Sequence, residues 1–213
     1  MPRRALRKPK VPQDLSCLHT LTDLSPPFTV CRLFDRIDQK VPLELEIGSG
    51  KGLFLRNAAA ANPGHDFVGI EVAPNYAAYS AHRLAVQGLT NARMICGDAA
   101  RFLAEFVPEA SLEAVHVYFP DPWWKQKHRK RRIMREEVLL LVHQRLTPGG
   151  KLHFWTDVKE YFDITLKLIA ARATKAPFDG PHLHPEEEES RTHFERRTRL
   201  NGKPVYRAFF LKK

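Results

Sequence analysis

Apolar and polar residues along this chain follow two spacings, one typical of β-strands and one typical of α-helices. In the segment 43–47 every second residue is apolar, which predicts a strand. The segment 53–61 carries a helical pattern that ends at Asn62-Pro63-Gly64, a strong stop signal. The same alternation continues along the chain: strands are predicted at 66–70, 92–96, 115–119 and 151–156, and helices at 75–87, 99–106, 133–145 and 159–172.

Strands that alternate with helices in this way are typical of an α/β fold. We therefore expect a doubly wound, mostly parallel, Rossmann-like sheet. The C-terminal region breaks the alternation, because 177–190 is a polar segment with an acidic block, which we interpret as a linker. Segments 194–200 and 205–211 surround Asn201-Gly202-Lys203, which predicts a C-terminal antiparallel hairpin.

The first 41 residues show no sustained period of either kind. Five of the first ten residues are basic, and five prolines are spread between residues 2 and 27. Such a composition favours a segment that is ordered only by an anionic partner or by the folded domain itself. We therefore divide the chain into a basic, proline-rich N-terminal arm, 1–41, and a folded domain, 42–213.

Length and charge limit the class of protein. At 213 residues the chain is long enough for one domain with a full core. The 34 Lys and Arg against 24 Asp and Glu give a net charge of +10, which favours polyanionic partners such as RNA or DNA. Three scattered cysteines without a C-x-x-C pair, and the lack of an apolar stretch of signal-peptide or membrane-span length, predict a cytoplasmic protein without membrane association. His182 and His184 have no Cys partner nearby, so we expect no bound metal.

Three carboxylates are predicted at the carboxyl ends of neighbouring strands, next to a glycine-rich turn. Glu46 precedes the turn 48–52, Glu71 ends the second strand, and Asp98 follows the third. Glycines there let backbone N–H groups approach a ligand, and an acid in the position of Glu71 accepts hydrogen bonds from ribose hydroxyls in nucleotide-binding folds. The G-x-G-x-G spacing matches neither the dinucleotide fingerprint nor the phosphate loop. An acid at a strand end can also simply cap the next helix, and this alternative stays open for Asp98.

The most distinctive stretch follows the strand predicted at 115–119. Pro120-Asp121-Pro122 ends this strand abruptly, two tryptophans come next, and six of the eight residues 125–132 are Lys or Arg. A carboxylate, an aromatic platform and a cationic patch therefore follow one strand end, where α/β folds bind ligands. Alternatively, a basic run is a solvated face or a localisation signal, and paired tryptophans are core residues.

Together these segments resemble the motif series of the bacterial tRNA (guanine-N7-)-methyltransferases. The resemblance covers about 43–210 and includes Leu45-Glu46-Ile47-Gly48-Ser49-Gly50, Gly69-Ile70-Glu71, Gly97-Asp98-Ala99, Phe119-Pro120-Asp121-Pro122-Trp123-Trp124-Lys125 with its basic tail, and Thr192-x-Phe194-Glu195-x-Arg197. It implies the fold of a class I S-adenosyl-L-methionine-dependent methyltransferase. It also implies S-adenosyl-L-methionine as methyl donor and a guanosine in the variable loop of tRNA as acceptor, with 7-methylguanosine as the product.

The resemblance further implies roles for individual residues. Glu46, Glu71 and Asp98 would hold the amino, ribose and adenine groups of the donor. Gly48 and Gly50 would lie beneath the donor, and Asp121 would lie next to it at the reaction centre. The tRNA would be positioned by Lys125, Asp157, Thr192, His193, Phe194 and Glu195. RNA contacts would come from Lys127, His128, Arg129, Lys130, Arg131 and Arg132.

The chemistry of guanine agrees with this interpretation. N7 carries an exposed lone pair, so it needs no deprotonation before it attacks a sulfonium methyl group. The base becomes cationic as the bond forms, and a fixed carboxylate such as Asp121 stabilises that charge. Two alternatives stay open: a methyltransferase that acts on an exocyclic base nitrogen of RNA, and a non-catalytic RNA-binding protein on the same fold. A nicotinamide dehydrogenase is disfavoured by the glycine spacing.

Overall fold

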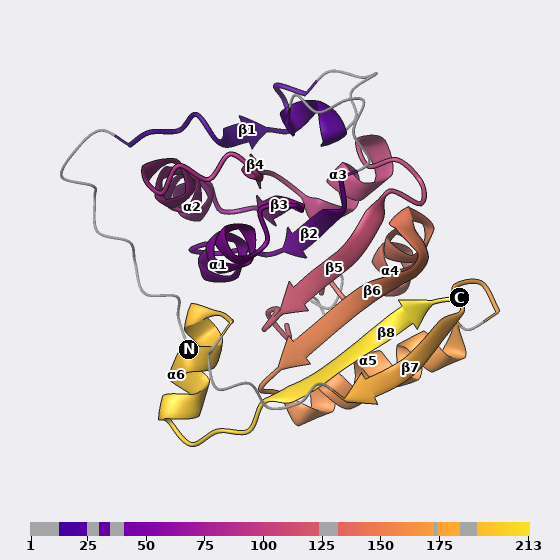
Figure 1. The fold of residues 1–213 in the computed structure, drawn as a ribbon. Coiled ribbons are helices and arrows are strands. Elements are labelled where there is room, and N and C mark those ends of the chain that lie inside the picture. The colour runs from indigo at the N-terminus through magenta and orange to yellow at the C-terminus, as the bar shows by residue number, and fades with distance from the viewer. Residues whose placement is uncertain (1–12, 25–29, 35–40, 124–131, 173, 184–190) are drawn as a thin grey trace.

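The computed structural model of the protein describes residues 13–24, 30–34, 41–123, 132–172, 174–183 and 191–213. Within these residues the chain forms an eight-stranded sheet with helices on both faces (Figure 1). The strands are β1 (Leu18–Thr20), β2 (Leu43–Ile47), β3 (Asp66–Glu71), β4 (Ala92–Cys96), β5 (Leu112–Tyr118), β6 (Leu146–Thr156), β7 (Phe178–Leu183) and β8 (Tyr206–Lys212). The helices are a short 3-10 helix η1 (Val30–Phe34), α1 (Leu53–Ala61), α2 (Pro74–Val86), α3 (Ala99–Glu105), α4 (Glu136–Arg145), α5 (Lys159–Ala171) and α6 (His193–Leu200).

The sheet has the strand order β1-β4-β3-β2-β5-β6-β8-β7. All neighbours from β1 to β6 are parallel, whereas β8 runs antiparallel to both β6 and β7. The strand order reverses around β2, which lies between β3 and β5. In sheets of this kind the carboxyl ends of the strands at such a reversal diverge and leave a crevice for ligands.

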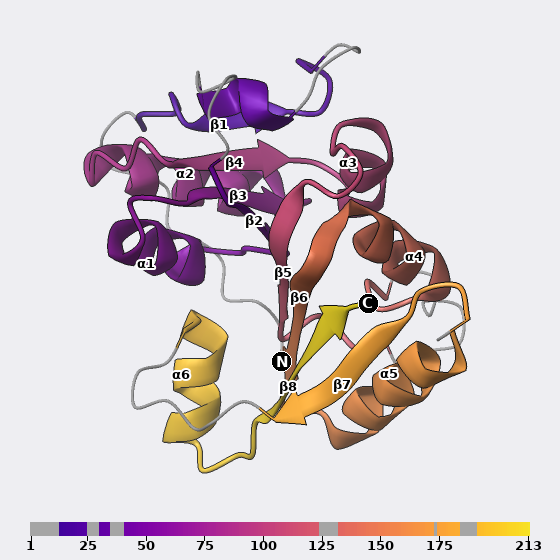
Figure 2. The same cartoon turned by 45° about the vertical axis from the view of Figure 1, so that its right-hand side comes forward.

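Helices cover the two faces of the sheet unequally (Figures 1 and 2). On one face, α1 and α2 pack on the first half of the sheet, where Leu55 and Met94 belong to the same buried cluster. On the other face, α3, α4 and α5 cover a larger cluster that includes Val115 and Phe154. Because both faces of the central strands are buried, these strands are apolar along most of their length.

The predicted alternation of strands and helices from 43 to 172 is confirmed. The largest differences are the starts of β5 at Leu112 and of β6 at Leu146, and the later start of α4 at Glu136. Leu112 and Leu146 pair with each other across a register shift. The Pro-Gly-Gly segment 148–150, which lies before the predicted strand 151–156, therefore belongs to β6.

The predicted C-terminal hairpin is correct in its antiparallel character but wrong in its first strand. Segment 194–200 forms α6 and not a strand, because Thr192 caps the helix by accepting a hydrogen bond from the N–H of Glu195 at 3.0 Å. The antiparallel partner of β8 is β7, which lies in the segment interpreted as a linker. Its pattern is hidden because Gly180-Pro181 interrupts it and the register shifts between Asp179 and His182.

Part of the predicted N-terminal arm belongs to the fold. β1 pairs in parallel with β4 at the edge of the sheet. Leu21, Leu24, Val30 and Phe34 are buried in the same cluster as α3. The described residues of the arm are therefore ordered by the folded domain, although a three-residue strand is too short to give a periodic signal.

Among the residues that the structure describes, no helix is long and apolar enough to cross a membrane. In the same part of the chain, no group of three or more His, Cys, Asp or Glu side chains is arranged to hold a metal ion. Cys17 and Cys96 are free thiols.

Candidate active site

A pocket of about 290 Å³ opens at the carboxyl ends of β2 and β5, where the strand order reverses. One wall is the glycine-rich turn after β2, another is the Pro-Asp-Pro turn after β5, and a third is the start of α6. Segments that lie far apart in the sequence therefore meet at one point. The predicted site residues that line the pocket are Glu46, Gly48, Gly50, Asp121, Asp157, Thr192, His193 and Phe194.

The turn after β2 is shaped by glycines in the left-handed region. Gly48 and Gly50 have φ angles of 78° and 55°, which side chains other than glycine rarely adopt. A Cβ atom on Gly48 would meet no other atom within 4 Å, so the backbone here borders open space. Gly48 and Gly50 therefore let a ligand approach the backbone closely.

Glu46 is a buried carboxyl group in the wall of this pocket. It is 4% exposed, and its Oε2 atom has no hydrogen-bond partner among the described residues. Burial, together with the nearby charge of Glu71, raises the pKa of Glu46 to about 8. Glu46 is therefore mainly protonated at neutral pH, and a cation bound beside Oε2 would favour its ionised form.

Glu71 and Asp98 end or follow their strands as predicted, but neither lines the pocket. Glu71 is buried, and its two oxygens accept hydrogen bonds from the N–H groups of Gly50 and Ala73, each at 3.0 Å. Glu71 thus holds the glycine-rich turn against the end of β3. Asp98 is exposed and caps α3 by accepting a hydrogen bond from the N–H of Arg101 at 2.9 Å. Asp98 therefore acts as a helix cap, which was the alternative role considered for it from the sequence.

The turn after β5 has a strained backbone on both sides of Asp121. Phe119 and Trp123 have φ angles of 49° and 40°, which are unusual for bulky residues. Strain of this kind is concentrated at functional sites, where the surrounding structure enforces it. Asp121 itself is exposed to the pocket, so its carboxylate is accessible to a ligand.

Arg132, predicted as an RNA contact, has a different environment from a solvated cation. Its side chain is 8% exposed, its Nε donates to the carbonyl of Pro122 at 2.7 Å, and its guanidinium lies 5.2 Å from the ring centre of Tyr161. Arg132 therefore supports the Pro-Asp-Pro turn from within. The other predicted residues of the basic run, Lys125, Lys127, His128, Arg129, Lys130 and Arg131, lie outside the described residues.

Glu195 is in the first turn of α6, on its buried side, and does not line the pocket. It is fully buried, and its Oε1 accepts hydrogen bonds from Arg199 at 3.0 Å and Arg207 at 3.1 Å. Its Oε2 accepts from the N–H of Arg191 at 2.7 Å. Glu195 therefore ties α6 to β8 and fixes the helix end that carries Thr192.

His193 lies at the pocket wall in a cationic environment. Burial lowers its pKa, and the charges of Lys51, Arg56, Arg196 and Arg83 lower it further. His193 is therefore uncharged at neutral pH. The cations around it come from α1, α2, α6 and the glycine-rich turn, which gives this side of the pocket a positive potential.

Several lining residues were missed by the sequence analysis. They are Lys51, Leu53, Phe54, Ser49, Tyr76, Tyr118, Phe119, Arg197, Thr198, Asn201 and Lys203. Those from α6 could have been found from the spacing Thr192-x-x-Glu195, which is a capping-box signal for a helix start. A helix beginning at His193 brings Arg197 and Asn201, four residues apart, onto one side.

The chain is similar to known methyltransferases in sequence and in fold. A family model described as "Putative methyltransferase" matches residues 40–208. The tRNA (guanine-N(7)-)-methyltransferase of Rhodopirellula baltica is 46% identical over 100% of this chain and 81% of the relative, and that of Alcanivorax borkumensis is 40% identical over 81% and 73%. A crystal structure of an aminoglycoside resistance methyltransferase superposes with a TM-score of 0.59 at 18% identity, and covers 87% of this chain and 94% of that one. The last likeness concerns the fold alone. The two sequence relatives and the family model show that this chain belongs to the tRNA (guanine-N(7)-)-methyltransferase family.

Proposed function

We propose that this protein transfers a methyl group from S-adenosyl-L-methionine to N7 of a guanosine in the variable loop of tRNA, forming 7-methylguanosine. The observation that carries the proposal is the meeting of Glu46, the glycine-rich turn, Asp121 and the start of α6 in one pocket at the reversal of the strand order. The family relationship over the whole chain gives the reaction class.

The residues of the pocket fit the donor. Glu46 offers a buried carboxyl oxygen without a partner among the described residues, which suits the donor's amino group. Gly48 leaves open space beside the backbone, as a closely held ligand requires. Glu71, which already holds this turn, is proposed to accept from the ribose hydroxyls, and Asp98 to contact the adenine. When bound, the donor supplies an electrophilic methyl group on a sulfonium sulfur.

Asp121 is proposed to orient the acceptor base and to stabilise its charge. Guanine N7 attacks with its own lone pair, so no side chain has to remove a proton first. A bond forms between N7 and the methyl carbon as the bond from that carbon to sulfur breaks, and the positive charge moves from sulfur to the base. A fixed carboxylate beside the base stabilises the charge that develops in the transition state more than it stabilises the neutral base of the ground state, and so lowers the barrier. Asp157, Thr192, His193 and Phe194 would hold the nucleotide against Asp121.

The tRNA is proposed to bind by its phosphates to the basic run 125–131. The net charge of +10 and the cations around His193 support a polyanionic partner. Lys125 is proposed to position the acceptor, and Lys127, His128, Arg129, Lys130 and Arg131 to contact the RNA. A protein with this substrate is expected to act in the cytoplasm.

A single substituted atom in the acceptor tests the proposed reaction. Replacing the target guanosine by 7-deazaguanosine exchanges N7 for a C–H group and leaves the exocyclic amine in place. The protein should methylate unmodified tRNA at N7, as judged by mass spectrometry of nucleosides, and should transfer no methyl group to the analogue. The analogue tRNA should still compete for binding, because phosphate and shape contacts survive the change.

The alternatives give different results in the same experiment. Methyl transfer to the 7-deaza tRNA at a near-normal rate would indicate an enzyme for an exocyclic nitrogen. Binding of tRNA by a protein that shows no affinity for S-adenosyl-L-methionine would indicate a non-catalytic RNA-binding protein. Either result would contradict the proposal.

A further inference from the structure

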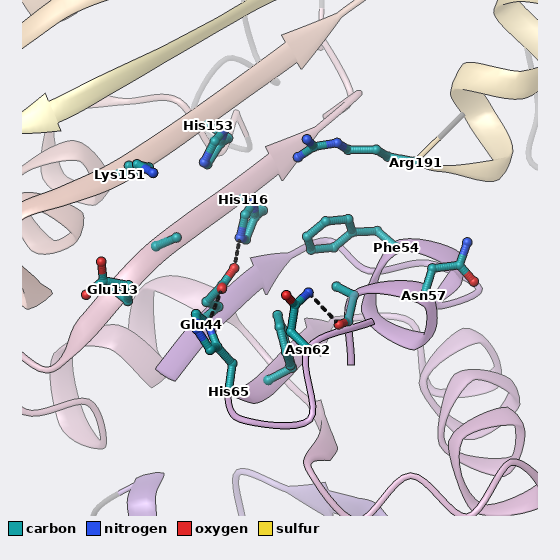
Figure 3. Close-up of a pocket in the computed structure, with 13 residues that line it drawn as sticks. Glu44, Phe54, Asn57, Asn62, His65, Glu113, His116, Lys151, His153 and Arg191 are labelled. Atoms are coloured by element: carbon teal, nitrogen blue, oxygen red, sulfur yellow. Dashed lines mark hydrogen bonds and ion pairs between the residues drawn. The ribbon is translucent and has the colours of Figure 1, made fainter. Parts of the chain in front are cut away.

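A second cavity, of about 550 Å³, lies beside α1, on the face of the sheet that α1 covers (Figure 3). It is lined by Glu44 from β2, His116 from β5 and His153 from β6. Glu44 has both carboxyl oxygens engaged: Oε1 lies 2.8 Å from His65 Nδ1, and Oε2 lies 2.7 Å from His116 Nε2. These contacts explain an acid deep within β2, for which the sequence gives no reason.

A series of hydrogen bonds leads from this cavity to the candidate active site. His116 Nδ1 lies 2.9 Å from the hydroxyl of Tyr118, and Arg191 Nη1 donates to the same hydroxyl at 3.1 Å. Figure 3 shows Arg191 reaching from the side of α6 toward His116. Tyr118 also lines the active-site pocket, whereas Glu44 and His116 do not. We call Glu44, His116, Tyr118 and Arg191 the relay.

The charge states of Glu44 and His116 follow from their surroundings. Burial raises the pKa of Glu44, but the hydrogen bonds with His116 and His65 outweigh it and hold the pKa below its ordinary value. Burial lowers the pKa of His116 by more than Glu44 raises it, and the charges of Arg191 and Lys151 lower it further. At neutral pH, Glu44 is therefore ionised and the His116 ring is neutral. His153, which stacks on His116 at 4.8 Å, contributes a ring contact from β6.

These charge states allow one direction for the hydrogen bonds of the relay. The guanidinium of Arg191 can only donate, so the oxygen of Tyr118 accepts from it. The single hydroxyl proton of Tyr118 then points to His116 Nδ1. The remaining ring proton of His116, on Nε2, is donated to the carboxylate of Glu44. A cation and an anion at opposite ends thus polarise two neutral groups in the same sense, which strengthens each bond.

Arg191 is the residue through which the relay reaches α6. Its N–H donates to Glu195 Oε2 at 2.7 Å, and its guanidinium lies 4.9 Å from the ring centre of Trp155. The next residue, Thr192, caps α6 and lines the active-site pocket. A displacement of the Arg191 side chain would therefore act directly on the helix start that forms one wall of the pocket.

We propose that the relay positions the start of α6 at the active-site pocket and thereby sets the affinity for the acceptor nucleotide. This inference rests on the proposed function, in which Thr192, His193 and Phe194 hold that nucleotide. Glu44 and His116 are positioning residues, since neither lines the pocket. Protonation of His116 below neutral pH places a proton on Nδ1, so that Tyr118 can no longer donate there and the sequence of bonds is broken.

Hydrogen exchange tests the relay without an assay of activity. In Glu44→Ala and His116→Ala, backbone amides of 191–200 should exchange about fivefold faster or more, because the side-chain anchor of Arg191 is weakened. In His116→Asn the side-chain oxygen can replace Nδ1 as acceptor, so exchange should return toward that of the wild type. Glu113→Ala is the matched control, because Glu113 lines the same cavity but is not part of the relay.

Steady-state kinetics test the consequence for tRNA. Glu44→Ala and His116→Ala should raise KM for tRNA about fivefold to tenfold, as expected for the loss of one buried hydrogen bond, and should change the Kd of the donor less than twofold. Adding Glu44→Ala to Arg191→Met should cause no further increase, because the two residues act through one path. The wild-type KM should also rise at acid pH, as the pH falls through the lowered pKa of His116, and this rise should be absent in His116→Asn.

Two results would overturn the inference. The first is an unchanged rate of amide hydrogen exchange in 191–200 in both alanine variants. The second is a KM for tRNA in the double variant of Glu44→Ala and Arg191→Met that has risen by the product of the two single increases. Failure of the proposed function is recognised separately, by the absence of 7-methylguanosine from tRNA treated with the wild-type protein. The exchange experiment still decides the relay in that case.

Discussion

The ring centres of Phe119 and Phe194 lie 5.0 Å apart, although the two residues belong to distant parts of the sequence. Phe119 begins the turn after β5 with a φ angle of 49°, and Phe194 is in the first turn of α6. Both residues line the active-site pocket. Their contact joins the Pro-Asp-Pro turn to the helix, so two walls of the pocket are held in one arrangement.

Replacing Phe194 with alanine should loosen this arrangement. An aromatic pair contributes about 0.5–1.5 kcal/mol beyond its buried area, so KM for tRNA should rise about twofold to tenfold. Steady-state kinetics with purified tRNA measure the change. Leu200→Ala is the control, because Leu200 is on the same helix and 79% exposed, and its KM should match the wild type. An unchanged KM in Phe194→Ala would show that the ring contact does not shape the pocket.

The parallel part of the fold could be predicted because its signals are local. The alternation in 43–47 lies within β2, and the stop at Asn62-Pro63-Gly64 directly follows α1. The C-terminal part could not be predicted in the same way, because the apolar residues of 194–200 are too few to distinguish the two periods. The helix is stabilised by the capping of α6 by Thr192 and by the buried carboxylate of Glu195. This carboxylate depends on a hydrogen bond from Arg207 of β8.

The candidate site was predictable where it depends on topology. Glu46 lies at the carboxyl end of β2 and Asp121 follows β5, and the carboxyl ends of parallel strands meet at one edge of a sheet. The role of Glu44 was not predictable, because its partners His65 and His116 come from other segments and are brought to it only by strand pairing. Long-range contacts of this kind leave no periodic trace in a sequence.

Binding of S-adenosyl-L-methionine should release about one proton from Glu46 at pH 6.5. The pKa of Glu46 is raised to about 8, so the group is protonated before binding, and a cationic amino group beside it favours the carboxylate. Calorimetry in two buffers with different ionisation enthalpies counts the protons. Glu46→Gln should bind more weakly and release none. A wild-type protein that releases no proton at this pH would remove Glu46 from the amino-group site.

The same residue should make stability depend on pH in the absence of donor. The pKa of Glu46 in the folded state, about 8, exceeds its ordinary value of 4.5, so between these pH values the folded state holds a proton that the unfolded state lacks. The contribution of Glu46 to the free energy of unfolding is therefore complete below about pH 4.5 and is lost as the pH rises through 8. The free energy of unfolding of the wild type relative to Glu46→Gln should fall from pH 5 to pH 8.5, as measured by urea denaturation. A constant difference would contradict the raised pKa.

Neutralising two residues of the basic run should reduce the salt dependence of tRNA binding. If Lys130 and Arg131 contact phosphates, each contributes about 0.7–0.9 to the slope of log K against log salt concentration, so the double alanine variant should have a slope smaller by about 1.5. Arg132→Ala should instead lower the free energy of unfolding, because Arg132 is buried and bonded to Pro122. An unchanged slope in the double variant would identify the run as a solvated face.

Asp121 provides the sharpest test of the proposed chemistry. Asp121→Ala should bind S-adenosyl-L-methionine nearly as well as the wild type, because Glu46 and the glycine-rich turn remain. Its single-turnover rate with tRNA should fall about 100-fold or more, the size of effect seen when one charge-stabilising group is removed. Asp121→Asn keeps the shape of the side chain and one acceptor oxygen but not its charge, so a rate close to that of alanine would assign the loss to the carboxylate charge. Near-normal rates in both variants would mean that Asp121 only shapes the turn between the two prolines, and that the charge on the base is stabilised elsewhere.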